Sequence, residues 1–324
     1  MQHRSEQWSV WGRAGRLGLA VVSLTALSQT AGAAEPKVVV TIKPVHALVA
    51  QVMAGADTPA LVVDGLASPH TYALRPSDTR LMNEAAVLFR VSDSVEPFTT
   101  RVVRSLPATV EVVTLAATPG LALLPRRFGT TFEKDAHAGH AHGAKVKTND
   151  ARDDHVWLDP DNAKRMLDRI AEVLAKKNPA RGALYQANAV KAKAGIDALD
   201  AEIQRDLKAV EGKPYVVFHD ATQYFEKRYG LNAVGSITVS PDVPPSGKRL
   251  ADLRKKVATL GATCVFSEPN FEAKVVQSVI EGTSAKTAVL DPEGARLTAG
   301  PELYATLMRG LAKGVRDCLA APPS

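Results

Sequence analysis

Residues 179–211 read PARGALYQANAVKAKAGIDALDAEIQRDLKAVE, and this stretch decides how the rest of the chain is arranged. Apolar side chains recur here at spacings of three or four residues, which is typical of one face of an α-helix. The members of this stripe are Tyr185, Ala189, Ala192, Ile196, Leu199, Ile203 and Leu207. At about 1.5 Å per residue, the helix would be roughly 48 Å long. This exceeds an ordinary crossover inside one small domain, so we predict a stiff connector that runs along two domains.

Short apolar runs alternate with helical patterns on both sides of this stretch, which is typical of parallel sheets covered by helices. The runs that we expect to form strands are 37–42, 59–66, 86–93, 109–116, 214–220, 232–237, 263–269 and 286–292. The stretches that we expect to form helices are 44–55, 76–85, 221–230, 246–261, 271–282 and 301–320. We therefore predict an α/β protein of two lobes, each with a mainly parallel sheet flanked by helices, joined by one long rigid linker helix, with a cleft between the lobes.

Residues 1–33 are expected to be an export signal. Arg13 and Arg16 precede the apolar stretch LGLAVVSLTAL (17–27), and small residues follow at 31–33, as in a cleavable signal peptide. The apolar stretch is shorter than the roughly 20 residues that cross a bilayer. The mature protein is then expected to be exported, with cleavage near Ala33 or Ala34.

The mature chain divides around the linker. We predict an N-terminal α/β lobe over 34–178, the linker helix over 179–211, and a C-terminal α/β lobe over 212–324. Two local signals set helix ends within these lobes. Asp159 is expected to cap a helix that begins at the following proline, and Gly230 is expected to end the helix before it.

Residues 125–153 interrupt the alternation of predicted strands and helices in the N-terminal lobe. They are polar and rich in Gly, Ala, His, Lys and Asp, so we predict a mobile loop without core positions. The part that reads DAHAGHAHG carries His137, His140 and His142. Ordering a flexible loop around a metal costs conformational entropy. We expect these three histidines to form a weaker, accessory metal site, and a solvated linker is the alternative.

The charge balance excludes one class of partner. The formal net charge is +6 over 324 residues, and the basic residues are accompanied by only six tyrosines and eight phenylalanines. A nucleic-acid-binding surface would cluster basic residues with aromatic ones, whereas here the lysines and arginines are spread along the chain. We therefore expect no nucleic-acid partner.

Cys264 and Cys318 are the two cysteines of the chain. An oxidising compartment outside the cytoplasm permits them to form a disulfide. The alternative is two buried free thiols that pack as small hydrophobic side chains. Export favours the disulfide.

Four polar residues are placed where a site can form. His70 and His219 follow or end predicted strands, Asp291 ends another, and His155 precedes the sequence VWL after the polar loop. Ligands of open α/β sheets bind beyond the carboxyl ends of the strands. A single histidine in such a place is more often structural than a ligand. Three imidazoles with one carboxylate, however, suit a tetrahedral divalent ion, above all Zn²⁺.

Five segments carry a resemblance to a known family. They read SPHTYALRPSD (68–78), HVWLDPDNA (155–163), VVFHDATQYFEKRYGL (216–231), CVFSEPNF (264–271) and VLDPEG (289–294). They resemble the motifs of the periplasmic zinc-binding proteins that serve zinc ABC importers, the metal-binding solute-binding protein family 9 of cluster A-I. The resemblance covers essentially the whole mature chain. It implies two α/β lobes, a rigid linker helix and a periplasmic location.

The resemblance also implies a ligand set. Zinc would be held in the cleft by His70, His155 and His219, and Asp291 matches the position that supplies a carboxylate in many members. Manganese-binding relatives have a glutamate where this chain has His219, so a third imidazole favours zinc. Some zinc members carry a glutamate where this chain has Pro69, which leaves Asp291 or water as the fourth ligand. The cysteine pair resembles a disulfide of some zinc members.

The sequence favours a binding protein over an enzyme. It contains neither the HExxH motif of zinc proteases nor the GxSxG motif of serine hydrolases. We expect a monomer that captures zinc without catalysis and passes it to the membrane permease of a zinc ABC importer. The alternatives are a manganese- or other metal-binding protein or adhesin on the same fold, and a secreted zinc hydrolase.

Overall fold

The structure is a computed structural model that describes residues 36–127, 132, 152–238, 245–260, 263–271 and 273–320. All of these residues belong to one compact unit, Glu35–Ser324. The expected export signal and the three histidines of the polar loop, His137, His140 and His142, lie outside the described residues. Within the described part of the chain, no helix combines the length and the apolar character needed to cross a bilayer.

The first half of the unit contains a four-stranded parallel sheet in the order β2-β1-β3-β4. Its two central strands are buried along their whole length, as expected for apolar runs that helices cover on both faces. The strands are β1 (Val38–Val40), β2 (Ala60–Leu61), β3 (Val87–Arg90) and β4 (Glu111–Thr114). The helices of this half are α1 (Lys43–Val52), α2 (Pro76–Asn83), α3 (Thr99–Val102) and α4 (Pro160–Lys177).

The second half repeats this plan. Its parallel sheet has the order β10-β9-β7-β8, so in each half the first strand lies between the second and the third. The strands are β7 (Pro214–His219), β8 (Asn232–Thr238), β9 (Cys264–Ser267) and β10 (Lys286–Val289). The helices are α6 (Gln223–Tyr229), α7 (Gly247–Leu260), α8 (Ala273–Ile280) and α9 (Leu303–Ala320). The predicted α/β fold class is confirmed.

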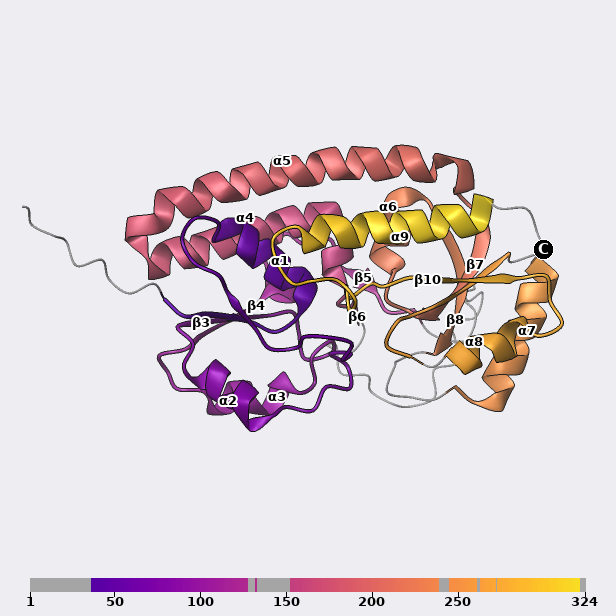
Figure 1. Ribbon diagram of the computed structural model, residues 1–324, viewed down its shortest axis with the longest axis horizontal. Helices are drawn as coiled ribbons and strands as arrows, with labels where there is room; N and C mark the ends of the chain where they lie inside the picture. Colours follow the sequence, from indigo (N-terminus) through magenta and orange to yellow (C-terminus); the bar gives the residue numbers. More distant parts are fainter. Residues whose placement is uncertain are drawn as a thin grey trace, which may run out of the picture. The chain divides into compact units, whose positions relative to one another are not determined.

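The predicted linker is α5 (Gly182–Leu207), an α-helix of 26 residues with a short 3-10 turn at each end. At about 1.5 Å per residue it is about 39 Å long, shorter than predicted because the 3-10 turns take up the ends. Six of the seven predicted stripe residues are buried, and Ala192 is half-buried. The buried stripe packs against α1, α4 and α9, and Figure 1 shows α5 lying along α4 and α9.

A second helix, α9, also connects the two halves. The largest hydrophobic core is continuous from β1 to α9 and includes side chains of both sheets and of α5. A smaller core lies between β7, β9 and the helices α7 and α8. The predicted disulfide between Cys264 and Cys318 is present and joins β9 to the last turn of α9. The periodicity of 179–211 indicated one connector, but α9 fastens the halves as well.

Both predicted helix-end signals are confirmed. Asp159 accepts a hydrogen bond from the backbone N–H of Asn162 at 2.9 Å, and α4 begins at Pro160. Gly230 ends α6 with a φ of 64°, the left-handed conformation that glycine adopts most readily. The ends of the predicted polar loop are ordered, because β5 (Leu124–Pro125) pairs with β6 (Arg152–Asp153) as an antiparallel ribbon.

Candidate metal centre

The structure brings together the three histidines that the sequence singled out. His70, His155 and His219 each offer one ring nitrogen, and these atoms all lie within 4.8 Å of one another. The ring centroids form a nearly equilateral triangle with sides of 5.3, 5.4 and 5.5 Å. Two of the rings come from the first half and one from the second, so only the folded chain assembles the group.

Different elements position the three rings. His70 follows β2 and His219 is the last residue of β7, so both lie beyond or at the carboxyl end of a strand. His155 directly precedes the 3-10 turn Val156–Leu158 and follows β6 by one residue. His155 and His219 are buried, and the His70 side chain is 8% exposed. The site is therefore largely shielded from water before any ligand enters.

The strand register of the second sheet fixes His219. Tyr215 lies opposite Cys264 in the parallel pair of β7 and β9, so the residues four positions further on, His219 and Glu268, also lie side by side. His219 donates from Nδ1 to Glu268 Oε1 at 2.6 Å. Its Nε2 is buried and has no hydrogen-bond partner among the residues that the structure describes. An orphaned buried nitrogen costs free energy unless a ligand takes it up.

A carboxylate holds His155 in the same way. Its Nδ1 donates to Asp153 Oδ1 at 2.7 Å, and its backbone N–H donates to the same oxygen at 3.0 Å. Burial, with the charge of His219, holds the pKa of His155 well below 6.5, so the ring is neutral at pH 7. With Nδ1 as the donor, the lone pair is on Nε2, which lies 3.3 Å from His70 Nε2. Carboxylates that orient metal-binding histidines work in this way.

Sequence reasoning missed a buried carboxylate beside the three histidines, Glu293, which lies next to their group but outside it. Its Oε1 lies 3.8 Å from His70 Nε2 and accepts a hydrogen bond from Ser68 Oγ at 3.4 Å. Its Oε2 accepts from Asn270 Nδ2 at 2.9 Å. Burial raises the pKa of Glu293 to about 8. Nothing local in VLDPEG marks this glutamate, because its place depends on how the segment after β10 folds back.

Asp291 occupies a different place. Its two carboxylate oxygens accept hydrogen bonds from the backbone N–H groups of Ala295 at 2.9 Å and Arg296 at 3.3 Å. It thereby holds the turn that carries Glu293, and it is not in the group formed by the three histidines. The role of Asp291 as a ligand stays a prediction.

The geometry suits a small tetrahedral ion. With metal–nitrogen distances of about 2.0–2.1 Å, the ligand atoms of tetrahedral zinc are about 3.3–3.4 Å apart. The Nε2 atoms of His70 and His155 are 3.3 Å apart. Imidazole nitrogens suit zinc and other late first-row metals, whereas oxygen ligands suit magnesium and manganese. These residues could therefore hold a divalent ion of the zinc type.

The sequence matches a known protein family over most of its length. The family described as "Zinc-uptake complex component A periplasmic" matches residues 38–318. The chain belongs to this family. Its sequence is 42% identical over 305 residues to the high-affinity zinc uptake system protein ZnuA of Brucella suis, over 87% of this chain and 91% of that protein. The resemblance inferred from the five motifs is confirmed.

Two solved structures of metal-binding proteins have the same fold as this chain. The crystal structure of ZnuA superimposes with a TM-score of 0.73 at 22% identity and covers 88% of this chain and 99% of that one. The periplasmic zinc binding protein TroA from Treponema pallidum gives a TM-score of 0.74 at 20% identity, over 89% of this chain and 100% of its own. At these identities the likeness shows the two-lobed fold with its long helix.

Proposed function

We propose that this protein captures a zinc ion in the periplasm, with His70, His155 and His219 as ligands, and delivers it to the permease of a zinc ABC importer. The observation that carries the proposal is the buried Nε2 of His219, which has no hydrogen-bond partner among the described residues and lies in one group with the ring nitrogens of the other two histidines. The zinc uptake named in its 42% identical relative supports the choice of cargo. The mature protein is proposed to act as a monomer after removal of residues 1–33.

Glu293 is the proposed fourth ligand, in place of Asp291 or water. Among the described residues, three carboxylates lie within 4.0 Å of a ring nitrogen of the group, and Asp153 and Glu268 each accept from a ring Nδ1. Glu293 is the remaining one. Closure of the fourth position also argues against catalysis, because a catalytic zinc keeps one position for water or substrate. The protein is therefore proposed to carry zinc without chemical change.

The proposed cargo is tested by titrating the metal-free protein with zinc and with manganese. We expect one tightly bound zinc per chain and manganese binding weaker by more than about 100-fold, because nitrogen ligands and the affinity order both favour zinc. Deleting residues 133–150 is expected to leave this one zinc in place. Equal affinity for the two metals would favour the general divalent-metal alternative, and loss of the tight zinc with the deletion would move the site to the loop.

Zinc affinity is expected to fall in acid. Burial alone would lower the pKa of His219, but the charge of Glu268 and its hydrogen bond outweigh burial and raise that pKa above 6.5. A ligand histidine must be neutral. Affinity therefore declines as the pH falls through this raised pKa and is expected to be low below about pH 6. Protonation of Glu293, whose pKa burial raises to about 8, weakens binding already at higher pH. Competition with a chelator at several pH values measures the profile.

Glu268→Gln provides the control for that profile. It removes the charge that raises the pKa of His219, so the decline is expected to move to lower pH while affinity near pH 7.5 falls. An unchanged midpoint would show that another group governs the pH dependence.

A further inference from the structure

The turn over 291–297 carries Glu293 from the second half toward the first. Asp291 holds the turn by accepting from the two backbone amides described above, and Gly294 gives it a φ of 66°. A Cβ on Gly294 would lie 3.3 Å from methyl carbons of both Leu303 and Leu307, so the turn is tight against α9. The position of Glu293 therefore depends on what holds this turn in place.

Lys43, the first residue of α1, fastens the far end of the turn to the first half. Its ammonium group donates to the backbone oxygens of Ala295 at 3.0 Å and Leu297 at 2.9 Å, and it pairs with Asp64 Oδ1 at 3.1 Å. The Lys43 side chain is only 6% exposed. An ammonium group has three N–H donors, so these three acceptors use all of them. Charge-assisted bonds of this kind are stronger than neutral ones.

A second bond fastens the near end of the turn. Trp157 in the first half donates from Nε1 to the backbone oxygen of Pro292 at 3.0 Å. Glu293 thus lies between two attachments to the first half, one at Pro292 and one at Ala295 and Leu297. Its own carboxylate then meets His70 and Ser68 from that half and Asn270 from the second.

We infer that Lys43 is a positioning residue of the zinc site, which keeps Glu293 beside His70 by holding the turn 291–297 on the first half. The inference rests on the proposed function with Glu293 as a ligand. Among the described residues, the Lys43 ammonium group contacts Ala295, Leu297 and Asp64 and none of the three histidines. It acts through the backbone of the turn, so its effect should depend on the presence of the Glu293 carboxylate.

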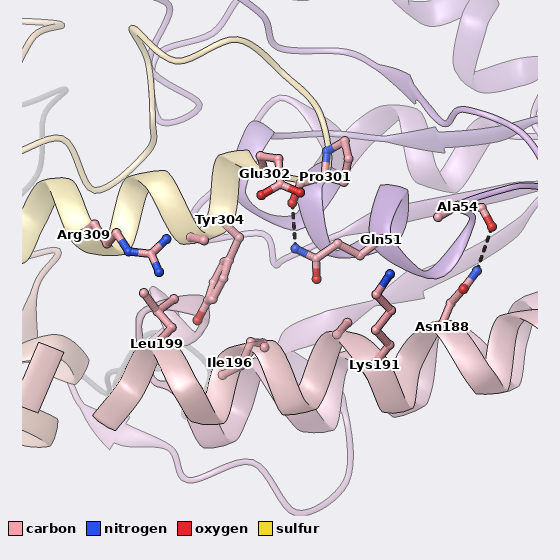
Figure 2. Close-up of a pocket in the computed structure, with 13 residues that line it drawn as sticks. Gln51, Ala54, Asn188, Lys191, Ile196, Leu199, Pro301, Glu302, Tyr304 and Arg309 are labelled. Atoms are coloured by element: carbon pink, nitrogen blue, oxygen red, sulfur yellow. Dashed lines mark hydrogen bonds between the residues drawn. The ribbon is translucent and has the colours of Figure 1, made fainter. Parts of the chain in front are cut away.

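Gln51 offers a matched control on the same helix. It also donates a side-chain hydrogen bond from α1 to a backbone oxygen of the C-terminal segment, Pro301 O at 2.7 Å. Figure 2 shows this bond beside a cavity of about 410 Å³ between α1, α5 and α9. Gln51 lies eight residues after Lys43, about 12 Å along the helix. Its loss removes one neutral side-chain hydrogen bond between α1 and the C-terminal segment without releasing the turn.

The test measures zinc dissociation into excess chelator for the wild type, Lys43→Met, Glu293→Gln and the double variant. Loss of a residue that supports a ligand costs about 10–100-fold in metal affinity. We expect Lys43→Met to speed dissociation at least about tenfold, Gln51→Met to leave it unchanged, and the double variant to match Glu293→Gln alone. An equal acceleration with and without Glu293, or none at all, would overturn the inference.

Two further variants provide a conservative control for Lys43→Met and a substitute for it. Lys43→Arg retains the charge and the donors and is expected to stay near the wild-type rate. Should Lys43→Met not fold, Trp157→Phe releases the other attachment, at Pro292, while it keeps an aromatic ring beside His155. It is expected to speed dissociation more when Glu293 is present than when it is replaced. Equal effects in both backgrounds would again overturn the inference. Failure of the wild type to retain zinc would overturn the proposed function itself, and the inference with it.

Discussion

Replacing His219 with alanine is expected to weaken zinc binding by more than about 100-fold. Removing a residue that only orients a ligand costs about 10–100-fold, and His219→Ala removes the ligand itself. It also leaves Glu268 buried without the ring that now donates to it at 2.6 Å. Glu268→Gln keeps the ring and should therefore lose less affinity than His219→Ala. Competition with chelators of known zinc affinity measures both losses.

His46 is the matched control for this experiment. It is a buried histidine of the first half whose Nε2 lies 2.9 Å from the backbone oxygen of Pro59, outside the group of three. Its replacement by alanine is expected to cost stability and to leave zinc affinity unchanged in the folded protein. Zinc binding by His219→Ala as tight as in the wild type would remove His219 from the site.

Replacing Arg127 with methionine is expected to destabilise the fold by about 3–5 kcal/mol, the usual loss when one partner of a buried ion pair is removed. Arg127 Nε donates to both carboxylate oxygens of Asp220, at 3.0 and 3.1 Å, and its terminal nitrogens donate to Glu226 at 2.6 and 3.1 Å. The exposed fractions of the Asp220 and Glu226 side chains are 6% and 5%. Methionine leaves two buried carboxylates without a counter-charge. Urea unfolding of metal-free protein measures the loss.

The pH dependence of that loss has a definite sign. Burial already raises the pKa of Asp220, against the hydrogen bond and charge of Arg127, which lower it. Without Arg127 the pKa rises further, and a carboxylate whose folded pKa is raised destabilises the fold at neutral pH and less so in acid. The deficit of Arg127→Met should therefore shrink between pH 7 and pH 5.

Arg309→Met is the control for Arg127→Met. Arg309 also makes a bidentate ion pair with a carboxylate, that of Glu202. The Arg309 and Glu202 side chains, however, are 51% and 38% exposed. Exposed pairs contribute only about 0–1 kcal/mol. A loss for Arg127→Met no larger than for Arg309→Met would show that the buried network does not stabilise the fold.

Local signals account for what the sequence could predict. A capping side chain or a terminal glycine acts within a few residues, so Asp159 and Gly230 could be assigned from their neighbours. The stripe of the long helix repeats often enough to be unambiguous over 26 residues. The three histidines were singled out because they lie beside predicted strands or loops and because motifs of the family surround them.

The residues that the sequence did not reveal act over long separations. Glu268 and His219 are 49 positions apart, and only the register of β7 and β9 brings them together. Arg127 lies in a segment that we predicted to be a mobile loop without core positions, yet its side chain is only 19% exposed. Its carboxylate partners are more than 90 positions away. No pattern of neighbouring residues encodes such pairs.

The assembly of the histidine group from distant segments affects the rate at which the protein is degraded. His70 and His155 are 85 positions apart, so an unfolded chain does not present the site. Under the proposed function, zinc at 100 times its Kd then favours the folded state by about 2.7 kcal/mol. Degradation that proceeds through the opened state follows the population of that state. Molecules that carry zinc would thus be cleaved about a hundredfold more slowly than empty ones, and the lifetime of the receptor would report the supply of its cargo.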